Sequence, residues 1–81
     1  SRVIVVGTAY ETFREKLVHA IQSIRIGPAD DPATTLGPVV DEASRERVEK
    51  YVALGNEEGR LVAQAPVPPH LAGTGNYVPA T

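Results

Sequence analysis

Apolar residues are consecutive at the start of the chain. Residues 3–6 read Val-Ile-Val-Val, and Gly7 closes the run. The short length, the β-branching and the flanking glycine predict a strand over residues 2–6. Because successive side chains of a strand point to opposite faces, this strand needs cover on both sides.

A helical spacing of apolar residues follows. The stripe consists of Phe13, Leu17, Ala20, Ile21 and Ile24. It predicts an amphipathic helix over about residues 9–23, which Gly27-Pro28 prevents from continuing. Thr8 and Glu11 have the spacing of a capping box, in which both side chains satisfy early helix N–H groups.

A second helix is predicted over residues 41–58. Asp41 is a good N-cap, and Gly59 is a natural residue just beyond the C-terminus. The apolar face of this helix consists of Val48, Tyr51, Val52 and Gly55. Glu46 and Lys50 have the favourable i,i+4 order of an ion pair.

The remaining segments are predicted to be loops and strands. Residues 27–38 contain three prolines and form an ordered, turn-rich connection. Residues 60–65 read as a strand ended by Pro66, and Tyr77-Val78 opens a third strand after a Pro- and Gly-rich loop. The order strand-helix-loop-helix-strand-loop-strand is typical of the α/β class.

Composition narrows the classes of function. The chain has 81 residues, 5% aromatic residues, no cysteine and a net charge of −2. Without a basic stripe the charge pattern of a nucleic-acid-binding protein is missing, and no apolar run is long enough to cross a membrane. The absence of cysteine excludes a disulfide framework and a thiolate metal site.

The sequence gives only weak evidence for a catalytic arrangement of residues. Nucleophile candidates are Ser1, Ser23 and Ser44, with His19 and His70 as bases, but their placement does not suggest a triad. The acidic neighbours, Asp30-Asp31, Asp41-Glu42 and Glu57-Glu58, are better explained as turn, cap and helix-end residues, and we expect no metal site. The Gly73-Thr74-Gly75-Asn76 segment lacks the preceding strand and following helix of a phosphate loop and is interpreted as a turn.

Several motifs carry a family resemblance when taken in order. They are Arg2-Val3-Ile4-Val5-Val6, Gly27-Pro28-Ala29-Asp30, Leu36-Gly37-Pro38-Val39-Val40-Asp41, residues 51–62 and Tyr77-Val78-Pro79-Ala80-Thr81. In this order the chain resembles the part of an aldehyde dehydrogenase catalytic domain that follows the catalytic cysteine. The 1-pyrroline-5-carboxylate dehydrogenases, alone or as half of a bifunctional proline-utilisation protein, are the most similar branch. Ala65-Pro66 and Ala80 depart from the family pattern.

The resemblance implies that residues 1–81 are one segment of a partial catalytic domain, incomplete at both ends. The parent enzyme would oxidise glutamate γ-semialdehyde to glutamate with NAD, using a cysteine just before Ser1 as its nucleophile. We therefore expect no catalytic, cofactor-binding or metal-binding residue here, and only Ser1 to support the cysteine loop. The expected partner is the rest of the enzyme.

The family resemblance also implies a homo-oligomer, and we expect it in the cytoplasm, or in the mitochondrial matrix if the protein is eukaryotic. The charge and hydropathy patterns predict no nucleic-acid or membrane partner. Two alternatives remain at this point. One is another aldehyde dehydrogenase, such as one that acts on succinate semialdehyde. The other is a small non-enzymatic interaction module that binds a partner through uncovered strands.

Overall fold

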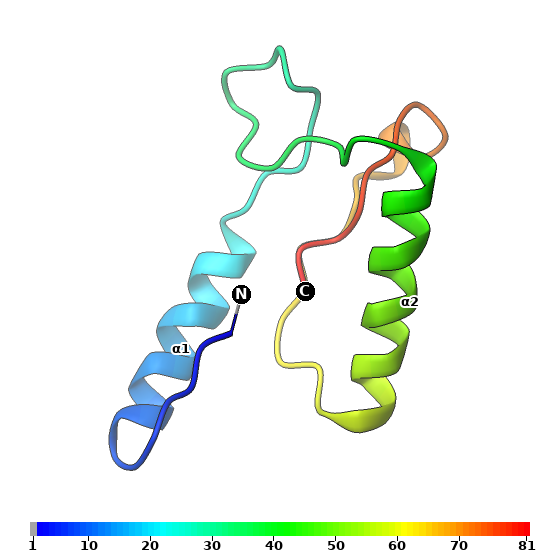
Figure 1. Ribbon diagram of the computed structural model, residues 1–81. Coiled ribbons are helices and arrows are strands. Elements are labelled where there is room, and N and C mark those ends of the chain that lie inside the picture. Colours follow the sequence, from blue (N-terminus) through cyan, green and yellow to red (C-terminus); the bar gives the residue numbers. More distant parts are fainter. Residues whose placement is uncertain (1) are drawn as a thin grey trace.

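Two helices that do not contact each other dominate the structure. A computed structural model describes residues 2–81 and contains helix α1 (Ala9–Gln22), helix α2 (Glu42–Glu58) and a short 3-10 helix η1 (Pro69–Leu71). The Cα radius of gyration is 14.1 Å, whereas a compact domain of this length would have about 12 Å. Figure 1 shows α1 and α2 as two separate helices below the region in which the loops meet.

Helix α1 confirms the predicted helix over residues 9–23, but its N-terminus differs from the prediction. Thr8 has helical backbone angles (φ −68°, ψ −15°) and makes no side-chain capping bond. A capping residue needs an extended backbone to aim its oxygen at the first N–H groups, so the predicted Thr8–Glu11 capping box is wrong. The Glu11 carboxylate accepts a hydrogen bond from Arg14 instead, at 3.3 Å.

Helix α2 confirms both its predicted bounds and its N-cap. Asp41 is extended (φ −155°, ψ 174°), and its carboxylate accepts a hydrogen bond from the backbone N–H of Ser44 at 2.7 Å. At the other end the N–H of Gly59 donates to the carbonyl of Gly55 at 2.8 Å. The helix therefore continues through Gly55 and ends where the sequence predicts.

Ion pairs on α2 differ from the predicted one. Arg45 contacts Glu49 at 2.9 Å and Glu42 at 3.4 Å. No pair between Glu46 and Lys50 forms in residues 2–81. Such exposed pairs contribute little to stability, so the difference leaves the helix bounds unchanged.

The three predicted strands are not present as strands within residues 2–81. Pairing is limited to two isolated bridges, a parallel one between Ile26 and Leu36 and an antiparallel one between Ala65 and Ala80. Residues 2–6 have no pairing partner, and Ile4 is 85% exposed. A strand needs neighbours for its backbone groups and its faces, and this chain does not supply them.

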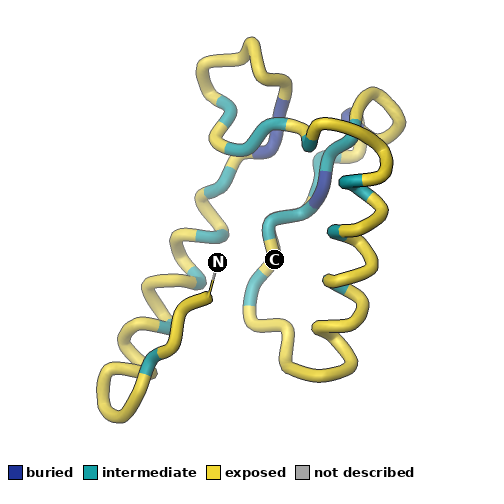
Figure 2. Tube along the Cα trace, in the orientation of Figure 1, coloured by how far each residue is buried: buried dark blue, intermediate teal, exposed yellow. Residues whose placement is uncertain are grey.

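The small core lies at the end of the molecule where the loops meet. It consists of Ile26, Ala65, Leu71 and Val78. Neither long helix contributes a buried residue, as the yellow surfaces of both helices in Figure 2 illustrate. The backbone N–H of Val39 donates to the carbonyl of Asn76 at 2.9 Å, which ties the first loop to the C-terminal segment.

Both predicted loop regions are confirmed as ordered turns. Thr35 donates its N–H to the carbonyl of Arg25 at 2.8 Å, and the Asp31 carboxylate accepts from the N–H of Ala33 at 2.8 Å. In the second region Gly73 has a positive φ of 78°, and the Thr74 hydroxyl donates to the carbonyl of Leu71 at 2.8 Å. The Gly73–Asn76 turn therefore reverses the chain between the bridged residues Ala65 and Ala80.

The two helix N-termini give a matched test of capping. We expect Asp41→Ala to unravel roughly one turn of α2, about 3.6 residues, because the Ser44 N–H loses its acceptor. Thr8→Ala is the control, since Thr8 makes no capping bond. Circular dichroism of the 81-residue chain measures the helix content; an equal loss in both variants would contradict the capping assignment.

We expect acid to weaken the N-cap that Asp41 provides for α2. Hydrogen bonding from the side chain and backbone of Ser44, with a smaller effect of the Arg47 charge, holds the pKa of the Asp41 carboxyl below its usual value of 3.8. The charged cap therefore stabilises α2 fully above pH 3.8, and this stabilisation is lost as the pH falls through the lowered pKa. We expect the helicity difference between the chain and Asp41→Ala to shrink in acid to about the difference between Asp41→Asn and Asp41→Ala, because the neutral Asn and the protonated Asp both keep a carbonyl acceptor; the Asn–Ala difference should not change with pH.

Candidate functional site

The chemically reactive side chains do not converge. Ser23 lies at the end of α1 and donates its hydroxyl to the carbonyl of Ala20 at 2.8 Å, while Ser44 accepts a hydrogen bond from Arg47 at 3.2 Å. His19 and His70 are exposed on different helices, α1 and η1. Ser1, the predicted support for a cysteine loop, lies outside the described residues.

Residues 2–81 do not gather a cluster of side chains typical of a metal site, and no helix follows their glycine-rich turn. These residues contain no group of three or more histidine or acidic side chains that could hold a metal ion. The Gly73–Asn76 turn is followed by the extended residues Tyr77 to Pro79 rather than by a helix, so it offers no helix N-terminus to a pyrophosphate. Within the same residues no helix is long and apolar enough to cross a membrane.

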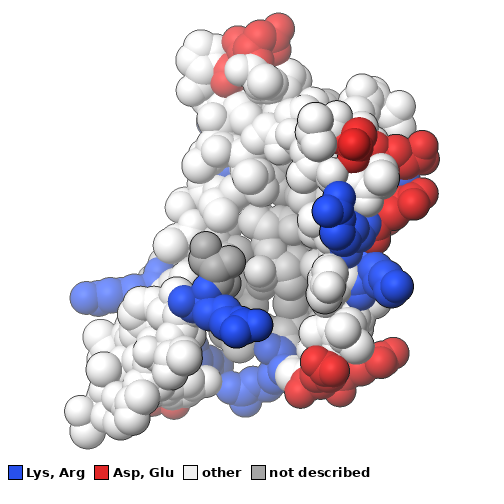
Figure 3. Space-filling view, viewed as in Figure 1, with Lys and Arg blue, Asp and Glu red and all other residues white. Residues whose placement is uncertain are grey.

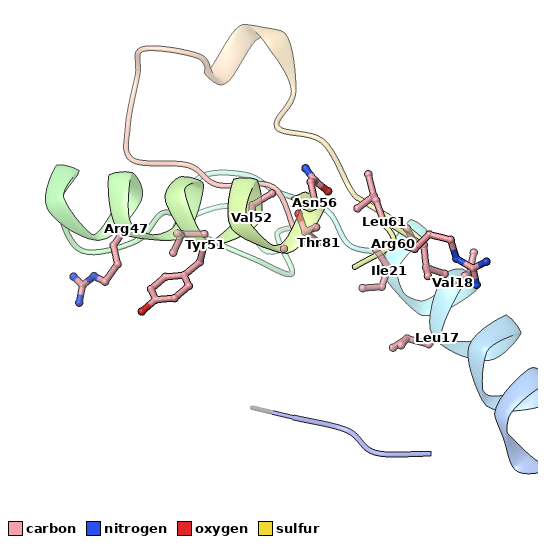
Figure 4. Close-up of a pocket in the computed structure, with 14 residues that line it drawn as sticks. Leu17, Val18, Ile21, Arg47, Tyr51, Val52, Asn56, Arg60, Leu61 and Thr81 are labelled. Atoms are coloured by element: carbon pink, nitrogen blue, oxygen red, sulfur yellow. The ribbon is translucent and has the colours of Figure 1, made fainter. Parts of the chain in front are cut away.

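A groove lies between α1 and α2, and we call it the interhelical groove. It has a volume of about 560 Å³ and opens to solvent. Figure 4 shows side chains from both helices and from the segment after α2 arranged around it. Its lining residues are Leu17, Val18 and Ile21 from α1, Arg47, Val48, Tyr51, Val52, Gly55 and Asn56 from α2, and Arg60, Leu61, Val62, Ala63 and Thr81.

Several apolar side chains of the groove are exposed to water, and the others are half-buried. Leu17 is 44% exposed, Tyr51 67% and Leu61 50%. Burying such a side chain fully is worth about 1.5–3 kcal/mol, and contiguous apolar patches mark interaction surfaces. The groove is therefore suited to packing against further apolar protein surface rather than to catalysis.

The charged side chains in the groove lining are both positive. Arg47 and Arg60 are its charged members, and no acidic residue lines it. Figure 4 shows the two guanidinium groups at opposite ends of the lining, with Tyr51, Val52 and Ile21 between them. In Figure 3 the acidic side chains that are visible gather at the periphery of the molecule.

Sequence reasoning found the apolar stripes of both helices but not the groove. Leu17 of the first stripe and Tyr51 of the second line the same groove. The sequence also did not predict that Arg60 and Leu61 line the same groove as residues of α1. This arrangement depends on the path of residues 23–41, and no local sequence pattern signals it.

Comparisons with known proteins give one family. The profile of the aldehyde dehydrogenase family matches residues 1–81. The chain is 38% identical over 63 residues to 1-pyrroline-5-carboxylate dehydrogenase of Bacillus subtilis, covering 78% of the chain and 12% of that protein. It is 38% identical over 82 aligned positions to betaine aldehyde dehydrogenase 1 of Rhizobium meliloti, covering 100% of the chain and 17% of that protein.

A third relative is also named an aldehyde dehydrogenase. Betaine aldehyde dehydrogenase of Brucella anthropi is 40% identical over 73 residues, covering 90% of the chain and 15% of that protein. No solved structure matches the chain significantly. The chain thus spans between 12% and 17% of the length of these relatives.

An apolar fluorescent dye such as anilinonaphthalene sulfonate tests whether the interhelical groove is open in solution. We expect Leu17→Asp to weaken dye binding roughly tenfold, since it removes about 1.4 kcal/mol of apolar contact from the groove wall. Thr12→Asp places the same charge on α1 outside the groove lining and should leave binding unchanged. Equal dye binding by both variants, measured by fluorescence titration, would contradict an open apolar groove.

Proposed function

Because the chain belongs to the aldehyde dehydrogenase family, we propose that it is one segment of a longer enzyme that oxidises glutamate γ-semialdehyde (1-pyrroline-5-carboxylate) to glutamate. The family match over all 81 residues is the observation that carries this proposal. The similarity to 1-pyrroline-5-carboxylate dehydrogenase of Bacillus subtilis supports the choice of substrate.

The role that we propose for these residues is mechanical. Nucleophile, base and metal ligands do not come together within residues 2–81. What the segment does offer is two regular helices whose apolar faces are open. A reacting group misplaced by about 1 Å can lose roughly 100-fold in rate, so a rigid surrounding scaffold contributes directly to catalysis.

In the parent enzyme we propose an α/β fold in which residues 2–6 and 60–65 become strands. Both segments lack regular secondary structure and are unpaired over most of their length, with exposed Val3, Ile4, Val6, Leu61 and Val62. Neighbouring strands from the rest of the polypeptide would satisfy their backbone groups. NAD would bind to that remainder, since the turn at Gly73–Asn76 does not fit a dinucleotide.

A second substrate, betaine aldehyde, has a specific observation in its favour. Betaine aldehyde dehydrogenase 1 of Rhizobium meliloti aligns with the whole chain, at an identity equal to that of the Bacillus subtilis relative. We favour glutamate γ-semialdehyde because Gly27-Pro28-Ala29-Asp30 and the Tyr51 to Gly59 stretch resemble the 1-pyrroline-5-carboxylate dehydrogenase branch. By the same resemblance we propose a homo-oligomeric enzyme of the cytoplasm or the mitochondrial matrix.

Turnover by the full-length protein that carries this segment tests the proposal. We expect formation of NADH from NAD with glutamate γ-semialdehyde, at a kcat/KM at least about tenfold above that with betaine aldehyde. The 81-residue chain alone serves as the control and should form no NADH above a sample without protein. Preference for betaine aldehyde would support the second substrate, and failure to oxidise either aldehyde would contradict the proposal.

A further inference from the structure

We draw no further inference here: the strongest candidate, the interhelical groove with Arg47 and Arg60 at its ends, is an unpartnered apolar face, and nothing in the structure shows what covers it.

Discussion

Within residues 2–81 the buried apolar side chains lie in the part of the molecule where the loops meet (Figure 2). Ile26, Ala65, Leu71 and Val78 bury themselves where the loop after α1 meets the C-terminal segment. The backbone bond from Val39 to Asn76 closes the same junction. Because no part of either long helix enters this cluster, the helices extend from it with their apolar faces uncovered.

That geometry explains why the interhelical groove is open. Helices in a self-contained domain bury their apolar stripes against each other or against a sheet. Here α1 ends and α2 begins near the same junction of loops, but the two helices do not contact each other. Apolar side chains of both helices therefore line the space between them. Apolar surface of this extent is unfavourable in water, and the simplest physical resolution is a further layer of protein in that space.

The parts of the fold that were predictable are those encoded locally. The bounds of α2 follow from Asp41 and Gly59, residues that act on the nearest turn of the helix. The prolines and glycines of the loops likewise act over a few positions. Thr8 shows the limit of this reasoning, since its type and spacing suit a cap but the turn at Gly7, with a φ of 69°, leads into helical rather than extended backbone.

Strands and groove could not be predicted in the same way because both depend on distant partners. Residues 2–6 have strand-like composition, yet hydrogen bonds of a sheet form only when a neighbour is present, and none is within residues 2–81. The groove requires Leu17 and Leu61, separated by the whole of α2, to reach the same space.

The positions of Arg47 and Arg60 add a further constraint to the covering layer. A purely apolar groove would accept many apolar segments in many registers, whereas a guanidinium at each end penalises any occupant that leaves it buried without a carboxylate. An arginine that loses water without gaining a partner destabilises the assembly more than a missing apolar contact does. A layer of protein over Leu17, Tyr51 and their neighbours would remove this apolar surface from water.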